Sequence, residues 1–278
     1  MKDRWFLVLP HACNSHSEAM LLTLDIGNTN ITAGLFDGAV LKQTWRLATR
    51  RDATGDELGA LLFSALGARG VEFGSIQGLC VCCVVPSLSA AARHFGREYL
   101  NVEPLEIGRD FDGLKNGYDD PRAVGADRLV NGFAAWKMAG GRPVVVADFG
   151  TATTVDAVSL DGTYLGGAIA PGIGISSDAL FRAAAKLPRV ELEAPPRALA
   201  TNTPHSVQAG LVFGYAGLTK ELVARVASEV EEREHVKPLV LATGGLAELI
   251  APFVPQIERV EGDLTLQGLR MIWEMNHE

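Results

Sequence analysis

Apolar residues along the chain occur in short runs separated by longer segments of mixed polarity. Runs rich in Val, Ile and Leu predict buried strands at the start of residues 21–38 and 144–162, and over 79–85 and 238–242. Apolar residues with a helical period predict helices over 54–66, 89–100, 128–138, 176–185, 207–230, 246–251 and 265–274. Strands that alternate with helices in this way predict an α/β fold with mixed β-sheets.

Two segments of the chain repeat one pattern. Residues 21–38 and residues 144–162 each hold an apolar strand, an Asp-x-Gly turn, a short polar run of Thr or Asn, a second apolar strand and an Asp-Gly turn. An Asp-Gly pair between strand-like runs is a strong hairpin signal. The repeat therefore predicts two related halves, an N-terminal lobe over 20–138 and a C-terminal lobe over 139–278, with the site between them.

The start of the chain does not fit this pattern. An apolar run over residues 5–9 follows Lys2 and Arg4 and ends at Pro10, which makes it shorter than the apolar region of a normal signal peptide. We therefore interpret residues 1–19 as an N-terminal extension that is not part of the fold, with Met20 as the functional beginning.

The charge of the chain limits the classes of binding partner, and its cysteine content indicates the cellular compartment. Asp and Glu number 33 against 25 Lys and Arg, and a chain of net charge −8 lacks the basic surface that binds a nucleic-acid backbone. No apolar run reaches the roughly 18 residues of a membrane span. The cysteines offer no second pair for a zinc site and fit a reducing compartment; they are Cys13, Cys80, Cys82 and Cys83. We expect a cytoplasmic protein that binds neither nucleic acid nor membrane.

Asp25 and Asp148 belong to the two Asp-x-Gly turns, and their chemistry indicates a nucleotide site. Glycine lets the backbone approach a ligand closely, and successive N–H groups can surround phosphate oxygens. A carboxylate beside phosphate needs an intervening cation, and Mg²⁺ prefers one or two carboxylates together with phosphate and water. Two such turns facing each other would hold a triphosphate with its metal, although Asp-Gly pairs also occur as ordinary turn residues.

A third glycine motif, Thr243-Gly244-Gly245, follows a predicted strand and precedes a predicted helix. Glycine at this point would let adenine or ribose lie against the backbone, near the N–H groups of the helix. The chain contains neither a Walker A motif nor a GxGxxG segment that opens a helix. P-loop and Rossmann nucleotide sites are therefore not indicated.

These features together resemble the superfamily of actin, Hsp70 and the sugar kinases, which has a duplicated ribonuclease H-like fold. The resemblance narrows to the type III pantothenate kinases on motifs that follow the order of that family. The motifs are Asp25-Ile-Gly-Asn-Thr29, Tyr118 to Gly125-Ala-Asp-Arg128, Asp148-Phe-Gly-Thr151, Gly167 to Gly172 and Asn202-Thr203. The resemblance covers about residues 20–278 and implies two lobes with mixed β-sheets and the active site in the cleft. The leader over 1–19 departs from the family.

The resemblance implies ATP-dependent phosphorylation of pantothenate to 4′-phosphopantothenate, the first step of coenzyme A biosynthesis. ATP would bind at Asp25, Ile26, Gly27, Asn28, Thr29, Asn30, Ile31, Thr32, Thr151, Gly244 and Gly245. Pantothenate would bind at Tyr118, Gly125, Ala126, Asp127, Arg128 and Thr203, with Thr203 supplied by the neighbouring subunit of a homodimer. A monovalent cation, K⁺ or NH₄⁺, is implied at Asp148, and the charge argument above assigns Mg²⁺ to Asp25.

Asp127 is the residue that the resemblance makes the catalytic base. From the residues alone, a carboxylate at the start of a helix is equally a cap or a partner of the helix dipole. Phosphoryl transfer needs a base near the attacking hydroxyl, and the family uses this Asp. Arg128, the next residue, could pair with the carboxylate of pantothenate or could form a surface salt bridge.

Two alternatives stay open at this point. One is another small-molecule kinase of the same superfamily, acting on a sugar or acetate, and the segment 125–128 argues against it. The other is a non-catalytic regulatory protein similar to the Bvg accessory factor, which would keep the fold and lose the base. The presence of Asp25, Asp127 and Asp148 favours catalysis.

Overall fold

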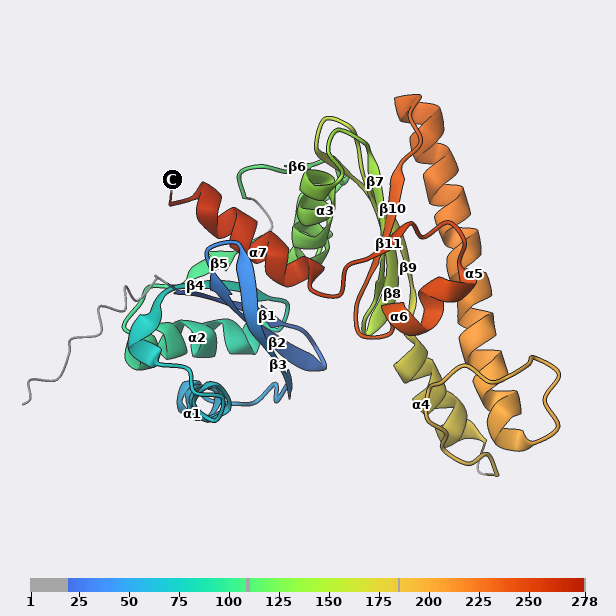
Figure 1. Ribbon diagram of the computed structural model, residues 1–278, viewed down its shortest axis with the longest axis horizontal. Coiled ribbons are helices and arrows are strands. Elements are labelled where there is room, and N and C mark those ends of the chain that lie inside the picture. The colour runs from blue at the N-terminus through green and yellow to red at the C-terminus, as the bar shows by residue number, and fades with distance from the viewer. Residues whose placement is uncertain (1–19, 109–110, 185, 278) are drawn as a thin grey trace, which may run out of the picture.

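The computed structural model describes residues 20–108, 111–184 and 186–277, which form two β-sheets with two helices between them (Figure 1). The first sheet has the order β3-β2-β1-β4-β5, built from β1 (Met20–Ile26), β2 (Asn30–Asp37), β3 (Val40–Ala48), β4 (Ile76–Cys83) and β5 (Leu105–Ile107). The second has the order β11-β10-β7-β8-β9-β6, built from β6 (Lys115–Asn116), β7 (Val144–Phe149), β8 (Ala152–Val158), β9 (Thr163–Pro171), β10 (Leu239–Thr243) and β11 (Arg259–Val260). The predicted extension over 1–19 lies outside the described residues.

The two sheets repeat one topology, which confirms the predicted duplicated α/β fold. In each sheet three consecutive strands form an antiparallel meander, and two later strands join it in parallel. The predicted Asp-Gly pairs lie between the second and third strands of each meander. There Gly38 and Gly162 have φ angles of +53° and +76°, a backbone conformation that glycine adopts at little cost.

The helices cover both faces of each sheet. On the first sheet lie α1 (Gly55–Gly67) and α2 (Pro86–His94), which a π-helical turn over Phe95–Leu100 extends. Between the sheets lie α3 (Ala126–Met138) and α7 (Leu264–Met275) (Figure 1). The second sheet is covered on its other face by the long α5 (Thr203–Glu234) and the short α6 (Ala247–Ile250), while α4 (Ile173–Ala183) follows β9. The 3₁₀ turns are Phe73–Ser75, Pro121–Ala123 and Ala251–Phe253. No helix within the described residues has the length and apolar character needed to cross a bilayer.

The alternation of side chains along β1 explains why this strand lies at the centre of its sheet. Leu22 and Leu24 are fully buried in the core shared with α1 and α2, whereas Leu21 is buried with Leu269 and Ile272 of α7. Successive side chains of a strand point to opposite faces, so a strand buried on both faces is a continuous apolar run. Residues 21–24 are all buried, including Thr23, so the first sheet needs a helical layer on each side.

Four helices, α2 to α5, begin two to four residues earlier than the periodicity predicts, and three of these starts have a local reason. The predicted start of α3 at Arg128 moves back to Ala126, with Gly125 at the N-cap in an extended conformation. In α5 the side chain of Asn202 accepts the backbone N–H of His205, so the helix starts at Thr203. In α2 the residue at N1 is Pro86, whose fixed φ angle suits the first helical position. The shift in α3 places Asp127 and Arg128 in its first turn.

The helix α7 packs on the first sheet although it ends the second half of the sequence. It contacts β1, β2 and β4, while α3, from the first half, contacts β7 and β8. The two helices meet at Gly268, where a Cβ atom would lie 2.8 Å from the carbonyl oxygen of Val130. The predicted division into residues 20–138 and 139–278 follows the repeat in the sequence. In space, α3 and α7 each pack on the sheet of the other half and so connect the two sheets.

We predict that Gly268→Ala destabilises the protein by about 1–3 kcal/mol, because the added methyl group meets the backbone of α3 and forces the two helices apart. Gly67→Ala is the matched control, since its Cβ would lie 3.7 Å from the Phe73 ring, at ordinary contact distance. That variant should be neutral or more stable by up to about 1 kcal/mol, because alanine favours helix. Urea unfolding of both variants tests this. Equal stabilities would contradict the close approach.

Candidate active site

A cleft of about 1240 Å³ lies between the two sheets, at the ends of β1 and β7. It is lined by twelve of the residues that the sequence singles out: Asp25, Gly27, Asn28, Thr29, Asn30, Thr32, Asp127, Arg128, Asp148, Thr151, Gly244 and Gly245. Ile26, Ile31 and Ala126 are buried in the core, so only their backbones could serve a ligand. Residues from both repeats and from α3 thus converge on one cavity.

The two Asp-x-Gly turns face each other across this cleft. The hydroxyl oxygens of Thr29 and Thr151 lie 2.9 Å apart. Two hydrogen bonds from Thr49 fix the first turn. The Thr49 hydroxyl donates to the carbonyl oxygen of Gly27 at 2.7 Å, and the Thr49 backbone N–H donates to the carbonyl oxygen of Thr29 at 2.9 Å. Such a turn keeps its shape without a ligand, so the arrangement is preformed for a polar group with several oxygens.

Asp25 and Asp148 occupy matching positions near the ends of β1 and β7. Asp25 lies opposite Thr32 of β2, and Asp148 lies opposite Thr154 of β8. Burial, together with repulsion from Asp127 and Asp148, raises the pKa of Asp25 to about 8. Burial, with repulsion from Asp127 and Asp156, raises the pKa of Asp148 to about 7. Without a cation, these two carboxyl groups therefore hold protons up to about neutral pH, and a bound cation would favour their ionised forms.

Asp127 joins these carboxylates from the N-terminus of α3. Its Oδ1 accepts the backbone N–H of Arg128 at 2.8 Å, and burial raises its pKa despite this hydrogen bond. A Cβ atom on Gly125 would overlap the same oxygen, so a side chain at position 125 would displace the carboxylate from this position. A carboxylate with a raised pKa, beside a preformed phosphate cradle, is suited to accept a proton.

Arg128 forms a buried ion pair, which neither interpretation of the sequence anticipates. Its guanidinium donates from Nε to Asp156 Oδ1 at 3.0 Å, and Thr154 and Tyr164 donate to the same carboxylate at 2.8 and 2.7 Å. The Arg128 side chain is only 10% exposed, so the alternative of a surface salt bridge is wrong, and its pairing with pantothenate stays a prediction. Part of the residue still lines the cleft, beside Asp127.

The carboxylates of Asp25 and Asp148 fit a metal ion whose remaining ligands come from a bound molecule. Asp25 Oδ1 is buried and has no hydrogen-bond partner, which is costly unless a cation or ligand completes the site. Asp148 Oδ2 accepts the amide N–H of Asn131 at 3.1 Å. Within the described ranges, no three Asp, Glu, His or Cys side chains are grouped closely enough to hold a metal alone. Mg²⁺ commonly takes one or two carboxylates and completes its shell with phosphate and water.

Gly244 and Gly245 lie directly against the second turn. Gly244 has a φ angle of +90°, and a Cβ atom there would lie 2.7 Å from the backbone nitrogen of Phe149. Gly245 lies beneath the guanidinium of Arg46, a residue of β3 in the first sheet. The glycines therefore bring the end of β10 close to Asp148, as a nucleotide spanning the cleft would require.

Four of the six predicted pantothenate residues lie outside the cleft lining: Gly125 and Ala126, which adjoin Asp127 at the start of α3, and Tyr118 and Thr203. The ring of Tyr118 packs near Tyr164, at 6.2 Å between centroids, and so borders the Arg128 ion pair. Thr203 is exposed at the N-terminus of α5, at the end of that helix near α4 (Figure 1). Within one chain, Thr203 is not brought to Asp127.

Several residues of the site carry no motif in the sequence. Asn131 links Asp148 to α7, because its side-chain oxygen accepts the hydroxyl of Thr265 at 2.7 Å. The sequence motifs likewise include neither Asp156 nor Arg46. Asp156 does leave a signal, since it is the charged residue of the strand β8, between Val155 and Ala157.

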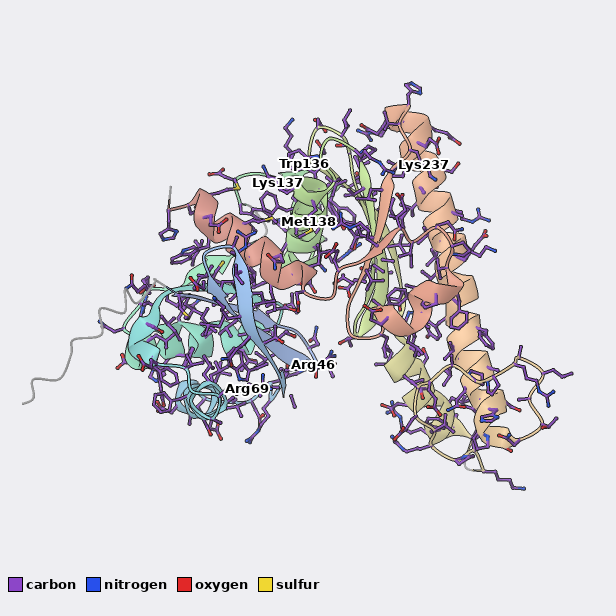
Figure 2. All side chains as sticks on the ribbon, viewed as in Figure 1. Arg46, Arg69, Trp136, Lys137, Met138 and Lys237 are labelled. Carbon is purple, nitrogen blue, oxygen red and sulfur yellow. The ribbon has the colours of Figure 1, made fainter. Side chains whose placement is uncertain are left out.

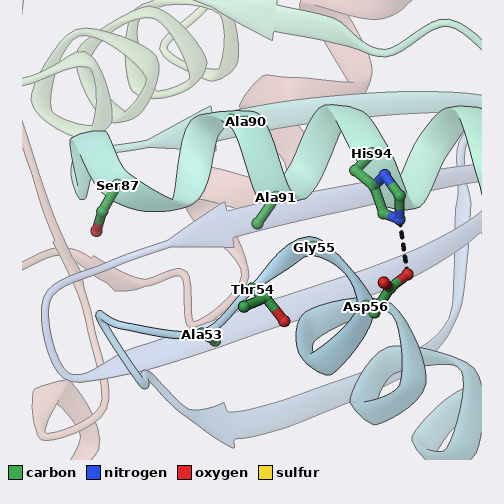
Figure 3. Close-up of a pocket in the computed structure, with 8 residues that line it drawn as sticks. All are labelled: Ala53, Thr54, Gly55, Asp56, Ser87, Ala90, Ala91 and His94. Carbon is green, nitrogen blue, oxygen red and sulfur yellow. Dashed lines mark hydrogen bonds and ion pairs between the residues drawn. The ribbon is translucent and has the colours of Figure 1, made fainter.

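A second, smaller pocket of about 240 Å³ lies between α1 and α2, away from these residues (Figure 3). There the ring of His94 points to Asp56, with 2.8 Å between Nε2 and Oδ1. Thr54 and Glu57 form a capping box at the start of α1. These contacts join two helices, and the pocket holds neither a glycine turn nor a group of buried carboxylates.

Comparison with known proteins agrees with this geometry. A family model described as type III pantothenate kinase matches residues 21–225. The chain is 48% identical over 261 residues to a type III pantothenate kinase of Moorella thermoacetica, covering 92% of this chain and 100% of the relative. It is also 48% identical over 258 residues to one of Roseiflexus sp. strain RS-1, covering 92% and 99% of the two chains.

Solved structures share the fold at low sequence identity. A Campylobacter jejuni protein assigned to the Baf family of transcriptional activators matches with a TM-score of 0.56 and 20% identity, over 92% of this chain and 98% of that one. An inorganic polyphosphate/ATP-glucomannokinase from an Arthrobacter species matches with a TM-score of 0.52 and 17% identity, over 93% and 100%. The fold is thus the duplicated one found in sugar kinases. Within that class, the chain belongs to the type III pantothenate kinase family.

We predict that Asp25→Asn stabilises the ligand-free protein at pH 8 by on the order of 1 kcal/mol, and has no such effect near pH 4. The pKa of Asp25 is about 8 when folded and near 3.8 otherwise, so the unfolded chain loses this proton first as pH rises. The carboxylate therefore destabilises the folded state progressively between those values. Urea unfolding in EDTA at both pH values measures the effect.

The matched control is Asp161→Asn, because hydrogen bonds from Ser159, Thr163 and Lys115 lower the pKa of Asp161. This carboxylate stabilises the folded state above its unfolded pKa, so the control variant should lose stability at pH 8. A loss of stability in Asp25→Asn at pH 8 would contradict the burial of its charge.

Proposed function

We propose that this protein transfers the γ-phosphoryl group of ATP to the 4′-hydroxyl of pantothenate, forming 4′-phosphopantothenate and ADP in the first step of coenzyme A biosynthesis. The observation that carries the proposal is the position of Asp127 beside two facing phosphate turns, in a member of the type III pantothenate kinase family. Positioning and charge stabilisation supply most of the catalysis in phosphoryl transfer, and this cleft offers both.

ATP would lie across the cleft with its phosphates at the two turns. The segment Asp25 to Thr32 and Thr151 would surround the β- and γ-phosphates, and Gly244 and Gly245 would take the adenosine. Asp25 is the residue that would hold Mg²⁺, since its Oδ1 is buried without a partner. Asp148 would hold K⁺ or NH₄⁺. When bound, these cations supply charge neutralisation around the phosphates.

Pantothenate would lie at the N-terminus of α3, at Tyr118, Gly125, Ala126, Asp127 and Arg128. Asp127 would accept the proton of the 4′-hydroxyl while that oxygen attacks the γ-phosphorus. The bond from the γ-phosphorus to the bridging oxygen then breaks and ADP departs. The ion pair with Asp156 would keep Arg128 in place beside the base, so that the substrate carboxylate meets an oriented guanidinium.

The two lobes proposed for the chain are residues 20–138 and 139–278, with the site in the cleft. The net charge of −8 supports an enzyme of small molecules that does not bind nucleic acid. We propose that it acts in the cytoplasm and does not bind a membrane. A non-catalytic regulatory protein similar to the Bvg accessory factor is the alternative, and an activity assay separates the two.

We also propose a homodimer with the site shared across the interface. Large apolar side chains stand exposed around the end of β9 and on α4: Ile169 at 64%, Ile175 at 46% and Leu180 at 37%. Ile169 and Ile175 also line the cleft. Exposed apolar residues at the rim of a site are typical of a surface that a partner covers. Thr203 of that partner would complete the pantothenate site.

The central test is an assay of ADP release that depends on pantothenate, with Mg²⁺ and either K⁺ or Na⁺. We expect turnover in K⁺, and we expect Asp127→Asn to lower kcat by about 10²–10⁴-fold while ATP still binds, because only the proton acceptor is lost. Calorimetry with a non-hydrolysable ATP analogue gives the binding arm.

Two results would overturn the assignment. Wild-type protein that releases no ADP with pantothenate would favour the regulatory alternative, and turnover with a sugar or acetate would favour another kinase of the superfamily. Full activity of Asp127→Asn would move the base to another residue.

The shared site predicts complementation between inactive subunits. Asp127→Asn and Thr203→Val subunits should each be impaired alone and regain activity when unfolded and refolded together, because a mixed dimer has one intact site. The matched control mixes Asp127→Asn with Asp25→Asn, which lie in the same cleft and should not complement. Steady-state rates and sizing measure both. A fully active monomer, or complementation in neither mixture, refutes the shared site.

A further inference from the structure

Arg46 shares one row of the first sheet with the proposed metal ligand. Asp25 of β1 lies opposite Thr32 of β2, and Thr32 lies opposite Arg46 of β3. Directly opposed residues of antiparallel strands project to the same face. All three line the cleft, and Figure 2 shows Arg46 projecting from the first sheet toward the second.

The guanidinium of Arg46 reaches the opposite wall of the cleft. A Cβ atom on Gly245 would lie 2.9 Å from Arg46 Nη2 and 3.1 Å from its Cζ. A side chain at position 245 would displace the guanidinium, so glycine leaves the space that Arg46 occupies here. Any nucleotide that lies along Gly244 and Gly245 must come within reach of this cation.

Arg46 is also the cation of the cleft that has no partner. The cleft is lined by carboxylates, namely Asp25, Asp127, Asp148, Asp178 and Asp263, and by three arginines. Arg128 is paired with Asp156, and Arg69 donates to the carbonyl oxygen of Thr44 at 2.8 Å while lying over the Trp45 ring. In the part of the chain that the structure describes, Arg46 forms neither a hydrogen bond nor an ion pair.

We propose that Arg46 binds the phosphate chain of the nucleotide from the first sheet, on the side of the cleft opposite Gly245. The proposal rests on the proposed function only in placing a nucleotide in this cleft. A guanidinium offers two parallel N–H donors that match the oxygens of a phosphate. In a cleft crowded with carboxylates, one unpaired arginine supplies the positive charge that the glycine turns lack. Arg46 thereby positions the nucleotide across both sheets.

The test compares ADP, AMP and adenosine as ligands of wild type, Arg46→Met and Arg46→Lys, by calorimetry with Mg²⁺ and without pantothenate. We expect Arg46→Met to weaken ADP binding by about tenfold to a hundredfold, as for loss of hydrogen bonds to a charged group. Adenosine binding should change by less than about twofold. Arg46→Lys should fall between, because it keeps the charge and loses the fork.

Arg69→Met is the matched control, because it removes a second arginine from the same cleft that is already held by protein groups. It should leave ADP affinity within about twofold of wild type. In turnover, Arg46→Met should raise KM for ATP and leave KM for pantothenate unchanged. Thermal unfolding of each variant shows whether it is folded. If Arg46→Met is not folded, the ADP affinity of Arg46→Lys still shows whether the guanidinium binds phosphate.

Two outcomes would overturn the proposal. Unchanged ADP affinity in both Arg46 variants would mean that the guanidinium does not bind phosphate. An equal loss for adenosine and ADP would mean that it stacks on the base. Because binding is measured without pantothenate, a wild-type protein that binds ADP and lacks pantothenate kinase activity would refute the proposed function and leave this result intact.

Discussion

Mutual repulsion among three carboxylates in one cleft is the constraint on which the rest of this structure depends. Asp25, Asp127 and Asp148 approach from β1, α3 and β7, and burial raises the pKa of each. A site of this kind is stable only when cations or protons balance the charge. The ligand-free fold must therefore hold these groups together by packing, and the cations that enter with a nucleotide relieve the repulsion.

The packing that opposes this repulsion comes from the two helices between the sheets. A polar chain runs from Thr265 of α7 through Asn131 of α3 to Asp148 of β7, with hydrogen bonds of 2.7 and 3.1 Å. The same helices approach closely at Gly268. Since α7 lies on the first sheet and α3 on the second, this pair fixes both sheets relative to Asp148. The position of Asp127, the proposed base, follows, because it lies in the first turn of α3.

The sequence predicts the parts of this site that repeat or that need glycine. Asp25 and Asp148 could be found because each begins a turn whose residues recur in the same order, and Gly244 because a strand leads into it. Three residues of the site could not be found in this way. Asn131 and Asp156 act through partners in other elements, and nothing near them in the chain specifies those partners. Arg46 reaches Gly245 of the opposite wall only because the two sheets face each other, which no local pattern indicates. The buried pairing of Arg128 with Asp156 depends on how α3 docks on β8, which periodicity does not determine.

The chain is acidic, and yet we propose that it binds a polyanion. Both hold together if cations neutralise the carboxylates of the cleft when the polyanion binds. In the proposed function, the cleft would take its selectivity from cations that arrive with the nucleotide, because ionised carboxylates repel a phosphate that lacks a metal. Glycine turns contribute N–H dipoles without adding net charge. A surplus of Lys and Arg would neutralise Asp25 and Asp148 permanently and remove the need for cations. Arg128 does not neutralise these carboxylates, because its guanidinium is paired with Asp156. The three carboxylates of the cleft would therefore remain available to cations that bind with the nucleotide.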